Sequence, residues 1–194
     1  MIKKGIILAG GTGTRLSPLT KAVNKQLLPI YDKPLIFYPL SILMLANIKN
    51  ILMIVNPGQI ENFKSLLGDG KRFGIKIQYK IQKKPKGLAD AFILGKNFIK
   101  KDNVALILGD NFFYGQSLTD KLEKSLTHTV GSRIFLKNVK TPENFGVAKI
   151  INNKIKKIIE KPKKFISNYA ITGLYFFDNK AVSYTHLTLP TTPY

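Results

Sequence analysis

A glycine-rich turn after the first apolar run carries the clearest chemical signal in the chain. The stretch Leu8-Ala-Gly-Gly-Thr-Gly-Thr-Arg-Leu16 places its glycines directly after a strand-like run, and such a turn lets backbone N–H groups approach a phosphate without Cβ atoms in the way. Arg15 closes the turn, and Lys25 follows ten residues later. A guanidinium fork and a point charge beside the loop suit a triphosphate whose leaving group gathers negative charge. An ordinary tight turn with two exposed cations is the alternative.

Two familiar phosphate-binding motifs do not fit this turn. A Walker A loop needs Lys-Ser or Lys-Thr after its last glycine, and neither follows Gly13. A dinucleotide-binding G-x-G-x-x-G pattern accommodates Gly11 and Gly13, but Leu16 stands where the third glycine belongs. A dehydrogenase would also carry an acidic ribose-binding residue after its second strand, where this chain has Asn56. A dehydrogenase is therefore disfavoured.

Other polar residues stand at positions where a sheet would present them to a ligand. Asp110 follows the apolar run VALILG, and the carboxyl ends of strands are where open α/β sheets bind ligands. Glu160 interrupts a strongly basic stretch, residues 154–164, although a surface ion pair would explain it equally well. Gln82 taken alone is a polar residue on an edge strand, and Asp110 taken alone fits a turn.

The elements that must position these residues follow from the apolar pattern. Short continuous apolar runs bounded by Gly, Asn or Asp are typical of parallel strands covered on both faces. Apolar residues at helical spacing lie between them, and Ser117 is expected to cap the last of these helices. The expected strands are 5–9, 51–55 and 104–108, and the expected helices are 39–46, 60–67, 88–98 and 117–126. This alternation predicts an α/β fold with a mainly parallel sheet.

After Arg133 the pattern becomes β-rich. Four further strands are expected, and Asn152-Asn153 is expected to form a tight turn between two of them. The strands are 134–139, 146–151, 154–159 and 170–177. The sequence thus predicts a β-rich addition to the α/β core. Tyr31, Phe37 and Tyr38 in the preceding part are expected to pack rather than to stack on a ligand.

Composition excludes several classes of protein. The chain has 194 residues, no cysteine, and a formal net charge of +20. Disulfides, Cys-ligated zinc, iron–sulfur clusters and thiol nucleophiles are excluded, and a reducing cytoplasm is expected. The apolar stretch 35–46 is shorter than the ~20 residues of a membrane span. The charge admits a nucleic-acid-binding protein as an alternative, but nearly all cations are lysines, whereas base readers favour arginine.

A wider set of motifs resembles the sugar-1-phosphate nucleotidyltransferases, over roughly residues 3–182 in unbroken order. Within that family the likeness is greatest to members that use dTTP and glucose 1-phosphate. The motifs are L-A-G-G-T-G-T-R-L-x-P-L-T, K-Q-L-L-P-I-Y-D-K-P, L-G-D-G, G-L-A-D-A-F, L-G-D-N, I-E-K-P and S-N-Y-A-I-T-G-L-Y. The resemblance implies a Rossmann-like, mainly parallel sheet flanked by helices, of the nucleotide-diphospho-sugar transferase type, and it makes the β-rich addition a sugar-binding region.

The resemblance also implies the reaction and the residues that carry it. The phosphate of glucose 1-phosphate would attack the α-phosphorus of dTTP, giving dTDP-glucose and pyrophosphate, so that alignment and charge neutralisation suffice. Arg15 and Lys25 are expected to be catalytic, and Asp110 to bind Mg²⁺ and the sugar phosphate. The expected nucleotide-binding residues are Leu8, Gly10, Gly11, Thr12, Gly13, Gln82, Pro85 and Gly87. The other expected sugar-phosphate-binding residues are Gly146, Glu160, Lys161 and Thr172.

Some features depart from the family pattern. Phe145 stands where relatives commonly carry Tyr, and the family continues for about another hundred residues that supply a second metal-binding Asp and much of a homo-oligomer interface. We therefore expect residues 1–182 to be a truncated catalytic domain with weak or no turnover, and residues 183–194, rich in Thr and Pro and free of Lys, to be a tail foreign to it. A UTP-using relative is the nearest alternative; neither nucleic acid nor membrane is an expected partner.

Overall fold

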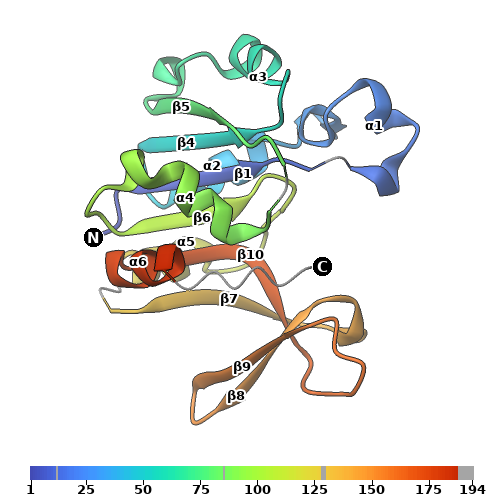
Figure 1. The fold of residues 1–194 in the computed structure, drawn as a ribbon, viewed down its shortest axis with the longest axis vertical. Helices are drawn as coiled ribbons and strands as arrows, with labels where there is room; N and C mark the ends of the chain where they lie inside the picture. The colour runs from blue at the N-terminus through green and yellow to red at the C-terminus, as the bar shows by residue number, and fades with distance from the viewer. Residues whose placement is uncertain (12, 85, 128–129, 188–194) are drawn as a thin grey trace. The chain divides into compact units, whose positions relative to one another are not determined.

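The structure is a computed structural model that describes residues 1–11, 13–84, 86–127 and 130–187. The chain forms two compact units (Figure 1): residues 1–133 together with 176–194 make the first, and residues 134–175 make the second. None of the helices in the described part of the chain combines the length and the apolar character that a membrane crossing requires. The change of pattern expected after Arg133 coincides with the boundary between the units.

The first unit is built on a parallel sheet with the strand order β5-β4-β1-β6. The strands are β1 (Lys4–Ala9), β4 (Asn50–Val55), β5 (Lys76–Ile81) and β6 (Val104–Leu108). β1 lies between β4 and β6, and Ile6, Ile7, Ile54 and Ile107 along these strands are fully buried. Burial on both faces explains why these strands are continuously apolar rather than alternating. The predicted parallel α/β sheet is confirmed.

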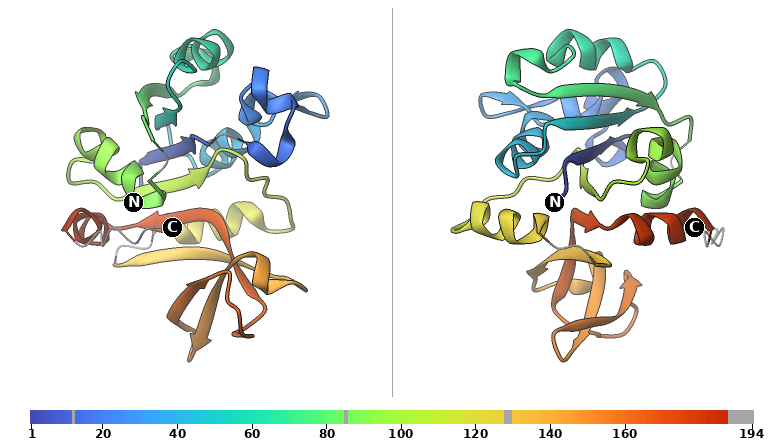
Figure 2. Two further views of the ribbon diagram at one scale, coloured as in Figure 1. Left: turned by 45° about the vertical axis from the view of Figure 1, so that its right-hand side comes forward. Right: turned by 90° about the vertical axis from the view of Figure 1, so that its left-hand side faces the viewer.

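Two helices cover opposite faces of this sheet, α2 (Phe37–Leu45) and α4 (Leu88–Ile99), as Figures 1 and 2 show. The other helices of the first unit are α1 (Leu19–Ala22), α3 (Ile60–Leu67), α5 (Leu118–Leu126) and α6 (Asn179–Leu187). The four helices expected from the sequence are confirmed to within two residues at each end. The capping role expected of Ser117 is wrong, because its φ is 55° and its side chain makes no capping hydrogen bond.

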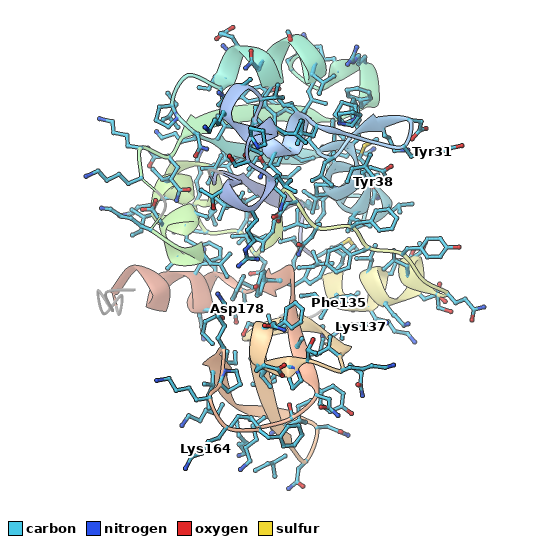
Figure 3. All side chains as sticks on the ribbon, turned by 90° about the vertical axis from the view of Figure 1, so that its right-hand side faces the viewer. Tyr31, Tyr38, Phe135, Lys137, Lys164 and Asp178 are labelled. Atoms are coloured by element: carbon cyan, nitrogen blue, oxygen red, sulfur yellow. The ribbon has the colours of Figure 1, made fainter. Side chains whose placement is uncertain are left out.

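A small hairpin, β2 (Pro29–Ile30) and β3 (Lys33–Pro34), precedes α2. Tyr31 lies in its turn and is 97% exposed, so the packing expected of this residue is wrong (Figure 3). Tyr38 meets the expectation: its ring packs edge-on against Phe112 at 4.9 Å between centroids. Phe37 packs in the same way on Phe73.

The second unit is β-rich, as expected. Its strands are β7 (Ser132–Asn138), β8 (Gly146–Ile151), β9 (Lys154–Glu160) and β10 (Tyr169–Phe177). The first two residues of β7 and the last two residues of β10 belong to the first unit. β10 pairs with both β7 and β8, and β8 pairs antiparallel with β9. Asn152 and Asn153 join β8 to β9 with φ values of 50° and 56°, the left-handed pair that a tight hairpin turn requires. The predicted turn is confirmed.

Candidate functional site

The chain turns sharply where β1 ends, and Gly10 and Gly13 are both required there. A Cβ atom on Gly10 would lie 2.7 Å from Oε1 of Gln82, closer than such atoms can approach. Gly13 has a φ of 62°, and a Cβ there would lie 2.8 Å from Cγ2 of Thr20. Gly10 is therefore needed because a neighbouring side chain leaves no room for a Cβ atom. Gly13 is needed for the same reason and because its backbone is left-handed. Thr12, expected to bind nucleotide, lies outside the described residues.

Asn56, the first residue after β4, holds this turn in place. Its Oδ1 accepts a hydrogen bond from the Gly11 N–H at 3.2 Å, and its Nδ2 donates to the Gly11 carbonyl at 2.9 Å. The amide therefore pairs with both backbone groups of one glycine, as a neighbouring strand would. Adjacent parallel strands end at the same edge of a sheet, so the residue after β4 lies beside the residues after β1.

A cleft of ≈ 300 Å³ opens beside the glycine turn. Its described lining includes most of the residues from which a phosphate site was expected: Gly10, Gly11, Gly13, Arg15, Lys25 and Asp110. Nζ of Lys25 lies 2.8 Å from Oδ2 of Asp110, and both side chains are about a third exposed. The Arg15 guanidinium has no hydrogen-bond or ion-pair partner among the described residues and is free to meet an anion. Leu8 is not part of the lining, because it sits within β1 and its carbonyl accepts from the Gly109 N–H.

Gln26 is a residue of this cleft that the sequence did not single out. Its side chain is buried with a residue exposure of 3%, yet among the described residues its Oε1 has no hydrogen-bond partner. A buried acceptor without a partner costs about 1–3 kcal/mol, and a hydroxyl or amine of a bound ligand would remove that cost. Its neighbour Lys25 was predicted from charge; a neutral amide gives no comparable signal in a sequence.

Gln82, expected near the nucleotide base, follows β5 and is only 3% exposed. Its Oε1 faces Gly10, and its Nε2 donates to Oδ2 of Asp90 at 2.7 Å. Gly87 begins α4 as its N-cap residue with a φ of 82°. The chain thus brings Gln82 beside the glycine turn; that it faces a nucleotide base stays a prediction. Pro85, expected beside the base, lies outside the described residues.

The residues expected to hold the sugar lie in the second unit. Gly146 and Glu160 face each other in the β8–β9 register, and a Cβ on Gly146 would lie 2.8 Å from Oε2 of Glu160. Lys161 follows directly, and its N–H donates to the Phe145 carbonyl. The Thr172 hydroxyl donates to the Phe135 carbonyl at 2.8 Å.

Burial raises the pKa of Tyr175, on β10, to about 12, and the charge of Glu160 adds to the effect. Tyr175 therefore stays protonated at neutral pH and keeps its O–H as a hydrogen-bond donor near the Glu160 carboxylate. Tyr175 ends the motif S-N-Y-A-I-T-G-L-Y, but the sequence assigned it no role, because its proximity to Glu160 arises only in the folded sheet.

A magnesium ion would find one carboxylate in the cleft. The described residues contain no cluster of three or more His, Cys, Asp or Glu side chains suited to hold a metal by themselves. Mg²⁺ is commonly bound by one or two carboxylates together with substrate phosphates. Asp110, partly exposed at the carboxyl end of β6, fits that mode, in which the nucleotide supplies the remaining oxygen ligands.

The fold and this cleft together define a class of protein. Residues 4–191 match the family described as nucleotidyl transferase, and the chain belongs to that family. Its α/β sheet with added antiparallel strands matches a UDP-glucose pyrophosphorylase solved with UDP-glucose at 26% identity, with a TM-score of 0.81 and with 98% of this chain and 81% of the other covered. The predicted family and fold class are thereby confirmed.

More particularly, the chain is similar to glucose-1-phosphate thymidylyltransferases. It is 55% identical over 188 residues to the enzyme of Neisseria meningitidis and 49% identical over 180 residues to that of Mycolicibacterium smegmatis. These matches cover 96% and 92% of this chain but 65% and 62% of the relatives, so the chain spans less than two thirds of their length. A Bacillus anthracis protein assigned the same activity and solved with sucrose matches with a TM-score of 0.89 at 41% identity, covering 97% of this chain and 76% of that one.

Proposed function

We propose that this chain carries the nucleotide-binding and catalytic centre for transfer of a thymidylyl group from dTTP to glucose 1-phosphate, giving dTDP-glucose and pyrophosphate. The observation that supports this most directly is the cleft at the glycine turn, which two cations, Arg15 and Lys25, line together with the carboxylate of Asp110. The names of the relatives support the choice of dTTP and glucose 1-phosphate. A cytoplasmic location, and homo-oligomers among the full-length relatives, stay predictions.

The reaction needs little covalent chemistry from the protein. A phosphate oxygen of glucose 1-phosphate forms a bond to the α-phosphorus of dTTP, the bond from that phosphorus to the bridging oxygen breaks, and pyrophosphate leaves with the electron pair. The attacking oxygen is already ionised, so no strong general base is required. The residues of the cleft would act by alignment and charge neutralisation.

Each cleft residue has a distinct task in this proposal. Gly10 and Gly13 would offer their backbone N–H groups to the triphosphate, while Asn56 keeps the N–H of Gly11. Arg15, without a partner among the described residues, would bind the phosphates that leave, because its fork matches two phosphate oxygens. Lys25 would exchange its ion pair with Asp110 for a phosphate oxygen when the nucleotide enters. Asp110 would then be released to bind Mg²⁺, which supplies further neutralisation of phosphate charge.

A second candidate is the same reaction with UTP. It is favoured by the structural likeness to a UDP-glucose pyrophosphorylase, a protein solved with UDP-glucose. The two nucleotides differ by the base methyl group and the ribose 2′-hydroxyl. A direct comparison of dTTP with UTP separates the two candidates.

The experiment measures nucleotide binding and pyrophosphate release by this chain. Calorimetry with dTTP, UTP and dATP, each with and without Mg²⁺, is followed by a single-turnover pyrophosphate assay at high protein concentration, since slow turnover is expected. We expect dTTP to bind more tightly than dATP, its affinity to rise with Mg²⁺, and pyrophosphate to appear on addition of glucose 1-phosphate. Tighter binding of UTP than of dTTP would favour the second candidate, and equal binding of dTTP and dATP would contradict both.

A pair of variants connects the result to the cleft. Asp110→Asn should lose the Mg²⁺-dependent part of dTTP affinity, at least about tenfold, because the charged metal ligand is gone. Asp102→Asn is the matched control: Asp102 is also an exposed carboxylate paired to a lysine, Lys4, but it does not line the cleft. Equal effects of the two substitutions would contradict the assignment of Asp110.

A further inference from the structure

The side chain of Gln82 is held in one orientation by Asp90. Nε2 of Gln82 donates to Oδ2 of Asp90 at 2.7 Å, in a part-buried setting. A carboxylate is an acceptor only, whereas the two ends of an amide differ, one being a donor and the other an acceptor. The NH₂ end of Gln82 must therefore face Asp90. The reversed orientation would place two oxygens against each other.

The fixed orientation leaves an acceptor at the glycine turn. Oε1 of Gln82 is 2.7 Å from the position that a Cβ of Gly10 would take. Among the described residues, Oε1 has no hydrogen-bond donor, while the backbone N–H of Gln82 is already used by the Val55 carbonyl at 2.8 Å. The side chain is 3% exposed, so it has little room to turn. A ligand that reaches this place would meet an acceptor on Gln82 rather than a donor.

Asp90 is well placed to act through Gln82 rather than on a ligand. It is the third residue of α4 and stands in the first turn of that helix, where the helix dipole favours a negative charge. Neither Asp90 nor Gln82 is in the described lining of the cleft; Asp90 is hydrogen-bonded to Gln82, whose Oε1 faces the glycine turn. Its role is that of a positioning residue.

We propose that Asp90 sets the base preference of this site by forcing Gln82 to present Oε1, so that the site selects a base whose edge offers a ring N–H donor. Thymine and uracil carry such a donor at N3. Cytosine carries an acceptor at N3, which would face Oε1 without a proton between them, and a buried mismatch of this kind is costly. The inference rests on the proposed function, in which Gln82 faces the base.

The test compares Asp90→Asn with the wild-type chain. Asparagine has nearly the same shape but offers both a donor and an acceptor, so Gln82 can adopt either orientation. We expect the ratio of dTTP affinity to dCTP affinity, measured by calorimetry with Mg²⁺, to fall about tenfold, mainly through tighter dCTP binding. Asp90→Glu should restore much of the ratio, because a carboxylate again excludes the reversed amide.

Asp120→Asn is the matched control, because Asp120 also stands in the first turn of a helix, α5, and is remote in sequence from Gln82. It should leave the ratio unchanged. Thermal unfolding of each variant separates a loss of fold from a loss of orientation. NMR of the Gln82 side-chain NH₂ gives a second readout without ligand: its protons should be shifted downfield in the wild-type chain and lose that shift in Asp90→Asn.

The outcomes separate this inference from the proposed function. A wild-type chain that prefers dTTP, together with a folded Asp90→Asn variant of unchanged preference, overturns the inference and leaves the proposed function standing. An unchanged NH₂ signal in Asp90→Asn also overturns it. A wild-type chain that binds neither nucleotide refutes the proposed function and this inference with it.

Discussion

One amide side chain fixes the backbone of Gly11, and the geometry of the turn depends on it. Asn56 occupies both the N–H and the carbonyl of Gly11. A turn rich in glycine is entropically costly to order, so an external clamp matters more here than it would at a stiffer segment. We therefore expect Asn56 to act on nucleotide affinity without touching the nucleotide.

Asn56→Ala should weaken dTTP binding by about tenfold and lower the free energy of unfolding by about 1–2 kcal/mol, because two part-buried hydrogen bonds are lost. Calorimetry and urea unfolding measure the two effects. Asn62→Ala is the control, since Asn62 is an exposed asparagine bonded to the Gln59 side chain at 3.3 Å. Unchanged dTTP affinity in a folded Asn56→Ala chain would show that the turn holds its geometry unaided.

The sequence predicted the site residues that carry a charge and the positions that only glycine can occupy. It did not predict the residues that act through a side-chain amide. Arg15, Lys25 and Asp110 were expected to serve one phosphate site, and they line one cleft. Gln26, which lines the same cleft, and Asn56, which holds the glycine turn, were not expected to contribute. An amide gains its role from the direction in which its donor and acceptor point, and that direction exists only in the folded chain.

At the scale of elements, α3 and the edge strand β5 are joined by a tyrosine. The Tyr79 hydroxyl donates to the Gly68 carbonyl, at the end of α3, at 2.7 Å. Burial raises the pKa of Tyr79 to about 12, and the charge of Asp69 adds to the rise. The unfolded chain would release this proton near the ordinary value of 10. The neutral hydroxyl therefore stabilises the fold below pH 10, and that contribution is lost as the pH rises toward 12.

We expect the urea midpoint of unfolding, followed by circular dichroism, to fall between pH 10 and pH 12. Tyr79→Phe should make this fall shallower, because one of the raised groups is removed while Tyr175, whose pKa is also raised to about 12, remains. Tyr31→Phe should leave the slope unchanged, since Tyr31 is 97% exposed. Equal slopes in all three chains would mean that Tyr79 ionises alike in the folded and unfolded states.

The sequence predicted the central strands better than the edge. β1, β4 and β6 are continuously apolar because they are covered on both faces, and their bounds were correct to within one residue. The bounds of β5 were not predicted, although Gln82, the residue after it, was interpreted as part of an edge strand. Its sequence, Lys-Ile-Gln-Tyr-Lys-Ile, has only Ile77 buried, and a strand with one neighbour shows no continuous apolar run. The Asn152-Asn153 turn was predictable because left-handed conformations select few residue types.

At the scale of the whole molecule, the charge of +20 is unevenly placed. The second unit, residues 134–175, has nine lysines and no arginine against Glu143 and Glu160 as its acidic residues. Single lysines on an exposed hairpin attract polyanions weakly and without selection. The proposed partner of the cleft cations, Arg15 and Lys25, is a nucleotide. The lysines of the second unit and the cations of the cleft should therefore bind different anions.

We expect a labelled DNA duplex to bind this chain at low salt and to be released between about 50 and 200 mM salt, as a purely electrostatic contact would be. Fluorescence anisotropy across that range measures it. Addition of dTTP should not displace the duplex, because the cleft is not its site. Salt-resistant binding that dTTP abolishes would instead support the nucleic-acid alternative.

The position of β1 between β4 and β6 has a consequence for synthesis of the chain. The glycine turn is made within the first 15 residues, but Asp110 follows β6, and Leu8 and Gly109 are tied by a backbone hydrogen bond. A nascent chain whose β6 has not yet emerged from the ribosome contains the glycine turn but lacks the carboxylate of Asp110 beside it. Nucleotide affinity should therefore arise late and abruptly as the chain emerges from the ribosome, once the sheet closes on β1.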